Sequence, residues 1–177
     1  MSNIEHELRI LDIDKAAVIS TLEALGAIKV GEFSYRRHVF EVIPSTKGRW
    51  VRLRTDGTTT TLTIKQIVSD KVDGTSEWET KVDDFDTTFV MLQKIGLTSK
   101  GYQENMRIMY SLDDADVCID TWPKIPTYLE IEAKSAAIIH DVTSKLGFSK
   151  KNLTGINVEK IYLLHGIDIT KKANLSF

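Results

Sequence analysis

The stretch Ile4-Glu5-His6-Glu7-Leu8-Arg9-Ile10 decides how the rest of the chain is interpreted. Successive side chains of a β-strand point to opposite faces, so Glu5, Glu7 and Arg9 share one face of this stretch. Taken alone, such a charged face is typical of a strand that is exposed to water. The same alternation returns in at least five later segments, which indicates a structure that gathers these charges together.

The composition indicates one soluble domain. The chain has 177 residues, of which 42% are hydrophobic, enough for a substantial core. The net charge of −2 provides no overall attraction to nucleic acid or to a membrane, and we expect neither partner. A single cysteine, Cys118, excludes an intrachain disulfide. The sequence shows no signal-peptide pattern and no run of ~18 apolar residues, so we expect a cytoplasmic protein.

Hydrophobic periodicity predicts eight strands and about four helices in a single domain over 1–177, with 166–177 as a loosely docked tail. The predicted strands are residues 4–10, 34–43, 49–54, 60–67, 76–82, 102–112, 116–121 and 128–133. The predicted helices are residues 15–25, 85–95, 135–146 and 157–165. Short hairpins such as the one at Asp56-Gly57 join several strands, which indicates a largely antiparallel sheet of the α+β class.

The polar face of the predicted strands is dense in ionisable side chains. These are Glu5, Glu7, Arg9, Arg52, Arg54, Lys65, Glu77, Glu79, Lys81, Arg107, Asp120, Glu130 and Glu132. Arginine suits bidentate contact with phosphate, and clustered carboxylates suit hard divalent cations. About eight strands can close a barrel with a usable interior. We therefore expect an eight-stranded antiparallel closed β-barrel, charged inside and apolar outside, whose buried charges a polyanion and metal ions would balance.

Seven motifs follow one another in a recognisable order. Glu5-x-Glu7-x-Arg9 opens the chain, and Arg52-Leu53-Arg54 follows. The others are Leu62-Thr63-Ile64-Lys65, Glu77-Trp78-Glu79, Arg107, the pair Asp120 and Leu129-Glu130-Ile131-Glu132, and Lys160 in the last helix. This series resembles the CYTH superfamily, the triphosphate tunnel metalloenzymes, whose opening signature is ExExK. Three positions depart from the family pattern: Arg9 and Asn105 stand where lysine is common, and Thr75 stands where arginine is often found.

The resemblance implies a tunnel that binds a triphosphate group along its axis, together with Mg²⁺ or Mn²⁺. The implied phosphate contacts are Arg9, Arg52, Arg54, Lys65, Arg107 and Lys160. The implied metal ligands are Glu5, Glu7, Glu77, Glu79, Asp120, Glu130 and Glu132. Within these sets, Lys65, Arg9 and Glu7 are the implied catalytic residues.

The resemblance leaves three functions open. The preferred one is a metal-dependent triphosphatase acting on inorganic triphosphate or a triphosphorylated organic compound, in which water attacks a terminal phosphorus. The second is a class IV adenylyl cyclase, in which the 3′-hydroxyl of ATP attacks the α-phosphorus and pyrophosphate leaves. The third is a non-catalytic binder of polyphosphate or nucleotide. A monomer or a homodimer is expected, because four helices leave part of a barrel's outer face uncovered.

Overall fold

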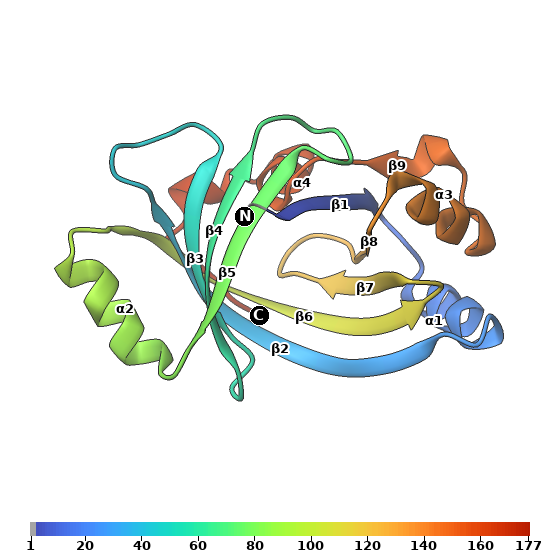
Figure 1. Cartoon of the computed structure of the whole chain (residues 1–177), viewed down its shortest axis with the longest axis horizontal. Coiled ribbons are helices and arrows are strands. Elements are labelled where there is room, and N and C mark those ends of the chain that lie inside the picture. The colour runs from blue at the N-terminus through green and yellow to red at the C-terminus, as the bar shows by residue number, and fades with distance from the viewer. Residues whose placement is uncertain (1–2) are drawn as a thin grey trace.

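A computed structural model describes residues 3–177, and within the first strand it describes the side chains from His6 onward. Its main strands are β1 (Asn3–Ile10), β2 (Ile28–Glu41), β3 (Arg49–Thr55), β4 (Thr60–Ile67), β5 (Thr75–Val82), β6 (Ser99–Leu112), β7 (Ala115–Thr121) and β8 (Tyr128–Ala133). They pair in the cyclic order β1–β8–β7–β6–β2–β3–β4–β5, and β5 pairs with β1 again (Figure 1). Every pair in this ring is antiparallel, which confirms the predicted eight-stranded closed barrel.

The four α-helices lie outside the barrel and cover parts of it (Figure 1). They are α1 (Lys15–Ala24), α2 (Phe85–Lys94), α3 (Ala136–Lys145) and α4 (Val158–Leu164). Each begins after a residue whose side chain accepts a backbone N–H of the first turn: Asp14, Asp84, Ser135 and Asn157, respectively. Such caps satisfy donors that the helix itself leaves unpaired, which explains why the helices begin at these residues.

Apolar side chains point outward from the strands and pack against these helices. Leu8 and Ile131, on adjacent strands, are buried together with Leu22 of α1 and Ile139 of α3. A second core lies beneath α2 around Phe40, Leu53, Phe85 and Leu92, and a third lies beside α4 around Trp122, Ile161 and Tyr162. None of the helices in the described part of the chain is long and apolar enough to cross a membrane.

Strand β2 differs from the prediction, which began it at residue 34. It begins at Ile28, because β6 is equally long and offers partners along its whole length, from Ser111 to Ser99. Sequence periodicity did not lead us to predict a strand over Ile28 and Val30, and both side chains are exposed in the structure. Figure 1 shows β2 and β6 as two long curved strands that lie side by side and reach toward α1.

Four short elements follow β8 in the described part of the chain. Helical turn η1 (Lys150–Asn152) leads into β9 (Leu153–Thr154), which pairs antiparallel with β1. In the predicted tail, η2 (Ile169–Lys171) precedes β10 (Asn174–Leu175), which pairs parallel with β6. Leu175 is only 2% exposed and belongs to the core beside α4.

Candidate functional site

The alternation of the first strand places Glu7 and Arg9 inside the barrel. Glu7 lies opposite Glu132 of β8, and Arg9 lies opposite Glu130. The intervening Leu8 lies opposite Ile131, and both belong to an outer core. Because the side-chain period of a strand is two, burying Leu8 outside the barrel directs Glu7 and Arg9 inside it.

One interior network of charges crosses β1, β8, β7 and β6. Arg9 contacts Glu7 at 3.1 Å and Glu130 at 2.6 Å, and it also donates to the carbonyl of Ile156 at 3.0 Å. Arg107 of β6 contacts Glu130 at 2.8 Å and Asp120 at 2.5 Å. Glu130 is therefore shared between two guanidinium groups. We call Arg9, Glu7, Glu130, Arg107 and Asp120 the first network.

A second network joins β3, β4 and β5. Arg52 contacts Glu77 at 3.3 Å and Glu79 at 3.4 Å, and Lys65 contacts Glu77 at 2.5 Å. Arg54 lies 3.8 Å from Glu79, which also accepts a hydrogen bond from the hydroxyl of Thr63 at 2.7 Å. Strand β4 pairs with β3 on one side and β5 on the other. Lys65 lies directly opposite Glu77, and the arginines of β3 reach across β4 to the carboxylates of β5.

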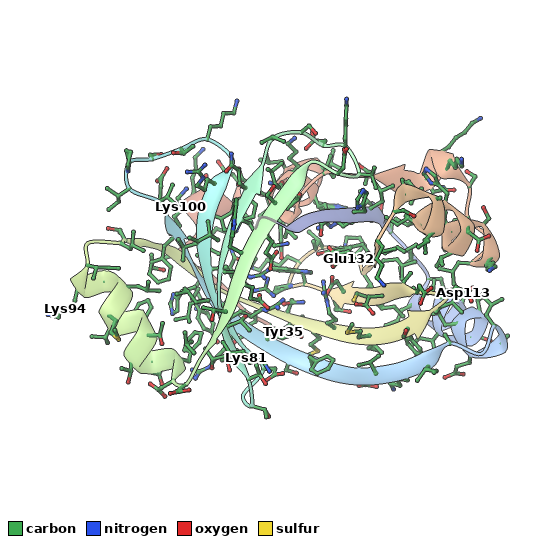
Figure 2. All side chains as sticks on the ribbon, in the orientation of Figure 1. Tyr35, Lys81, Lys94, Lys100, Asp113 and Glu132 are labelled. Carbon is green, nitrogen blue, oxygen red and sulfur yellow. The ribbon has the colours of Figure 1, made fainter. Side chains whose placement is uncertain are left out.

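The two central carboxylates of β8 have opposite electrostatic surroundings. Burial acts to raise the pKa of Glu130, but the adjacent Arg9 and Arg107 outweigh it and hold the pKa well below the usual range. For Glu132, burial together with Glu130 and Glu7 raises the pKa to about 7. Among the described side chains, none forms a hydrogen bond or ion pair with Glu132. Figure 2 shows Glu132 inside the ring of strands, between β1 and β7.

Burial and electrostatics also act on two of the interior arginines. Glu130 and Glu7 raise the pKa of Arg9, although burial alone would lower it. The pKa of Arg54 falls to about 10 because of burial and the nearby charge of Arg52. The first network is thus electrostatically satisfied, whereas Arg54 of β3 lies in surroundings with excess positive charge.

Among the predicted site residues whose side chains the structure describes, Lys160 and Glu132 form no contact within these networks. Lys160 of α4 is about half exposed and forms an ion pair with Asp70, in the loop between β4 and β5. The backbone of Glu5 pairs with Thr75 of β5, but its side chain lies outside the described residues. The other predicted phosphate contacts and metal ligands lie in the barrel interior.

Sequence reasoning missed a buried pair beside the first network. Arg37 of β2 is 7% exposed and donates a hydrogen bond to the side-chain oxygen of Asn105. The amide nitrogen of Asn105 in turn donates to Asp120 at 3.1 Å. Alternation along β2 could have found Arg37, because the adjacent His38 faces outward into an aromatic group with Phe89.

The fit of a divalent cation can be judged from the carboxylates. Within residues 6–177, the structure contains no preformed group of three acidic, histidine or cysteine side chains that could hold a metal. Glu130 and Asp120 are paired with arginine, and Glu7 is paired with Arg9. Glu132 has no such pair among the described residues, and it lies directly opposite Glu7 in the pairing of β8 with β1. Burial, followed by the negative charges of Glu130 and Glu7, raises the pKa of Glu132, and a divalent cation would offset those charges. These two carboxylates therefore fit a Mg²⁺ or Mn²⁺ ion.

The fold and site define a closed antiparallel barrel whose interior is lined by arginine and carboxylate. The chain belongs to the CYTH domain family, whose model matches residues 3–154. No curated protein matches the chain in sequence.

Three solved structures are similar in fold. A Pyrococcus horikoshii OT3 protein has a TM-score of 0.79 and 20% identity, covering 89% of this chain and 98% of its own. A candidate adenylate cyclase of Vibrio parahaemolyticus has a TM-score of 0.77 and 12% identity, covering 92% and 99%. A candidate adenylyl cyclase of Hippeastrum, described as having a dominant triphosphatase activity, has a TM-score of 0.62 and 14% identity, covering 94% and 96%.

Proposed function

We propose that the protein is a divalent-metal-dependent phosphohydrolase that acts on inorganic triphosphate or a triphosphorylated organic substrate. The observation that carries this proposal is the barrel interior, where basic side chains and carboxylates from seven described strands form two networks. Such charges are costly to bury without a compensating ligand. A triphosphate with a divalent cation has the charges that complement both kinds of side chain.

The basic residues are proposed to hold the phosphates. Arg52, Arg54, Lys65 and Arg107 line the interior, and their donors match phosphate oxygens. Arg9 orients Glu7 and Glu130 in the free protein, and we propose that it also contacts phosphate. Lys160 would join them when its surface pair with Asp70 opens.

The acidic residues are proposed to hold Mg²⁺ or Mn²⁺, with Glu7 and Glu132 as the core of the site. Glu5, Glu77, Glu79, Asp120 and Glu130 complete the proposed set, some as ligands and others as groups that orient the arginines. When bound, the cation would neutralise charge on the phosphate chain and favour attack by water. Phosphoryl transfer depends mainly on positioning and charge neutralisation, which suits an interior without an obvious protein nucleophile.

Adenylyl cyclase activity is the second candidate, because two of the similar structures belong to candidate adenylyl cyclases. The Hippeastrum protein's dominant triphosphatase activity supports hydrolysis as the first choice for this barrel. The two reactions differ in the phosphorus attacked and in the nucleophile, and both use the same charged interior.

Product analysis tests the proposal. The protein is incubated with inorganic triphosphate or ATP and either Mg²⁺ or Mn²⁺, and the products are separated. Orthophosphate is expected; cyclic AMP with pyrophosphate would instead establish the cyclase, and binding without turnover would establish a non-catalytic binder. Lys65→Ala and Glu7→Gln should abolish turnover, whereas Lys29→Ala, on the exposed surface, should retain it.

A further inference from the structure

Arg37 is a buried cation without a carboxylate partner. Its Nη2 donates to Asn105, and its guanidinium lies over the ring of Trp122, 4.7 Å from the centroid. Its Nε has no hydrogen-bond partner among the described residues, and none of their carboxylates forms an ion pair with it. A guanidinium taken out of water without a counter-charge is costly, so the arrangement is incomplete in the free protein.

The neighbours of Arg37 are themselves cationic. Arg37 lies directly opposite Arg54 in the pairing of β2 with β3, and Arg52 is two residues farther along the same face. The guanidinium groups of Arg54 and Arg37 lie 4.6 Å and 6.0 Å from the ring centroid of Tyr35. Like charges directly opposite each other on a sheet destabilise it. Burial, followed by the charges of Arg52 and Arg54, holds the pKa of Arg37 well below its usual range.

These positive charges lie away from Glu132, which belongs to the core of the proposed metal site. Figure 2 shows Tyr35, which marks the arginine group, and Glu132 in clearly separate parts of the barrel interior. Arg37 contacts the Asn105 amide, Arg54 lies 3.8 Å from its nearest carboxylate, and Arg52 is shared between two acids. An anion between these residues would find several donors that carry a net positive charge.

We propose that Arg37, together with Arg54 and Arg52, binds a phosphate group of the substrate at the β2–β3 side of the interior. The inference rests on the proposed function, because it assigns a further binding residue to the same polyphosphate. A phosphate dianion would provide the missing counter-charge, and the guanidinium, placed over the ring of Trp122, would offer it paired N–H···O contacts.

Binding of inorganic triphosphate, measured by calorimetry without a divalent metal, tests the site apart from catalysis. Arg37→Met should weaken binding by about tenfold or more, since each charged hydrogen bond to phosphate contributes substantially. Arg36→Met is the matched control, because Arg36 is the exposed neighbour on the outer face, over the ring of Phe85. Its affinity should stay within about twofold of the wild type.

Two further variants separate a role in binding from a role in folding. Arg37→Lys keeps the positive charge. In R37M/N105K, the lysine at position 105 places an ammonium group beside Asp120, where Asn105 contacts the Arg37 guanidinium in the wild type. We expect both to regain much of the affinity that Arg37→Met loses. If Arg37 only packed on Trp122, a lysine at position 105 of β6 would not restore the affinity that Arg37→Met loses. The unfolding midpoint of each variant without ligand shows whether the fold is retained.

The outcomes distinguish this site from the proposed reaction. Three results would show that Arg37 does not bind phosphate, without contradicting the proposed hydrolase. They are an unchanged triphosphate affinity in Arg37→Met, an equal loss of affinity in Arg36→Met, and a loss that neither lysine variant restores. Arg37-dependent binding without turnover would overturn the hydrolase and leave the site standing. If Arg37→Met does not fold, the affinity of Arg37→Gln decides: a loss of about tenfold would support the site, and a value within about twofold of the wild type would overturn it.

Discussion

Glu130 is the residue on which the first network depends. It accepts contacts from Arg9 at 2.6 Å and from Arg107 at 2.8 Å, and its side chain is 9% exposed. Each arginine has a second acid, Glu7 or Asp120, but only Glu130 connects the two halves. Removing one charge from such a buried group leaves the others without compensation.

We predict that Glu130→Gln lowers the free energy of unfolding by about 3–5 kcal/mol at neutral pH. The folded-state pKa of Glu130 is depressed, so its stabilising contribution is present above the unfolded value and is lost as pH falls through the folded pKa. The difference from the wild type should therefore shrink as the solution becomes strongly acidic. Urea unfolding across pH measures this, with exposed Glu23→Gln as a control that should stay near zero.

The contribution of Glu132 to stability depends on pH in the opposite direction to that of Glu130. Its folded-state pKa of about 7 lies above the usual value of 4.5, so the folded protein retains a proton that the unfolded chain loses. In the metal-free protein, this group should make stability fall as pH rises from about 4.5 to about 7, and have no further effect above that.

A divalent cation should reverse this trend, because it requires Glu132 in its ionised form. We predict that Mn²⁺ raises the unfolding midpoint more above pH 7 than below it. Glu132→Gln should remove most of this increment and flatten the metal-free pH dependence. An unchanged Mn²⁺ increment in Glu132→Gln, measured by thermal unfolding at both pH values, would argue against a metal ligand at this position.

At the scale of elements, β8 shows how alternation divides the two environments. Leu129 and Ile131 have no exposure and belong to an outer core, while Glu130 and Glu132 lie inside. The pairing of β8 with both β1 and β7 fixes this register from two sides. A slip of one residue would place carboxylates in the apolar core, so the same pattern that builds the fold also positions the acids.

Helix α4 is the element whose contribution to the site is least fixed. Its Lys160 pairs with Asp70 on the surface, and exposed pairs of this kind contribute less than about 1 kcal/mol. The helix itself is firmly placed, because Tyr162 is fully buried and its hydroxyl donates to the carbonyl of Pro123 at 2.7 Å.

We predict that Asp70→Asn strengthens triphosphate binding severalfold by releasing Lys160 from its pair. Lys160→Ala should weaken binding, and Asp70→Asn should bring no gain in the Lys160→Ala background. Calorimetric titration of the four proteins completes this cycle. Additive effects would show that Lys160 does not act on phosphate through this exchange.

At the scale of the whole molecule, the pairing of β6 with β7 completes the ring of strands. Residues 106–112 of β6 pair with β7, while 99–111 pair with β2, so one long strand connects the two sides of the barrel. The interior thereby brings together charges that are far apart in the chain, such as Arg9 and Glu130. The interior also crowds Arg37 against Arg52 and Arg54, and Glu132 against Glu130 and Glu7. These like charges make a ligand-free interior less favourable than an occupied one.

Ligand binding should therefore stabilise the whole fold. We predict that inorganic triphosphate with Mg²⁺ at about a hundred times the dissociation constant raises the free energy of unfolding by about 2.7 kcal/mol. Sodium chloride at equal ionic strength should give a much smaller rise, because it screens surface charges without occupying the interior. Equal stabilisation by the two would contradict a specific anion site, and chemical denaturation with each additive measures the difference.

The sequence by itself determined which face of each strand is charged, and hence most of the candidate site. The predicted bounds of β4 and β8 coincide with those observed, because hydrophobic alternation is a local property that neighbouring residues fix. The interior positions of Glu7, Arg52 and Glu130 follow from the same alternation. The resemblance of the motif series then indicated the closed barrel.

Only the tertiary structure decided which charges meet. The sharing of Glu130 between two arginines, the surface pair of Lys160 and the cationic surroundings of Arg37 all depend on contacts between distant segments. No local pattern encodes such partners, because they are set by strand order and register around the ring. The opening stretch Glu5-x-Glu7-x-Arg9 thus established that the interior is charged, while the fold determined how those charges are balanced.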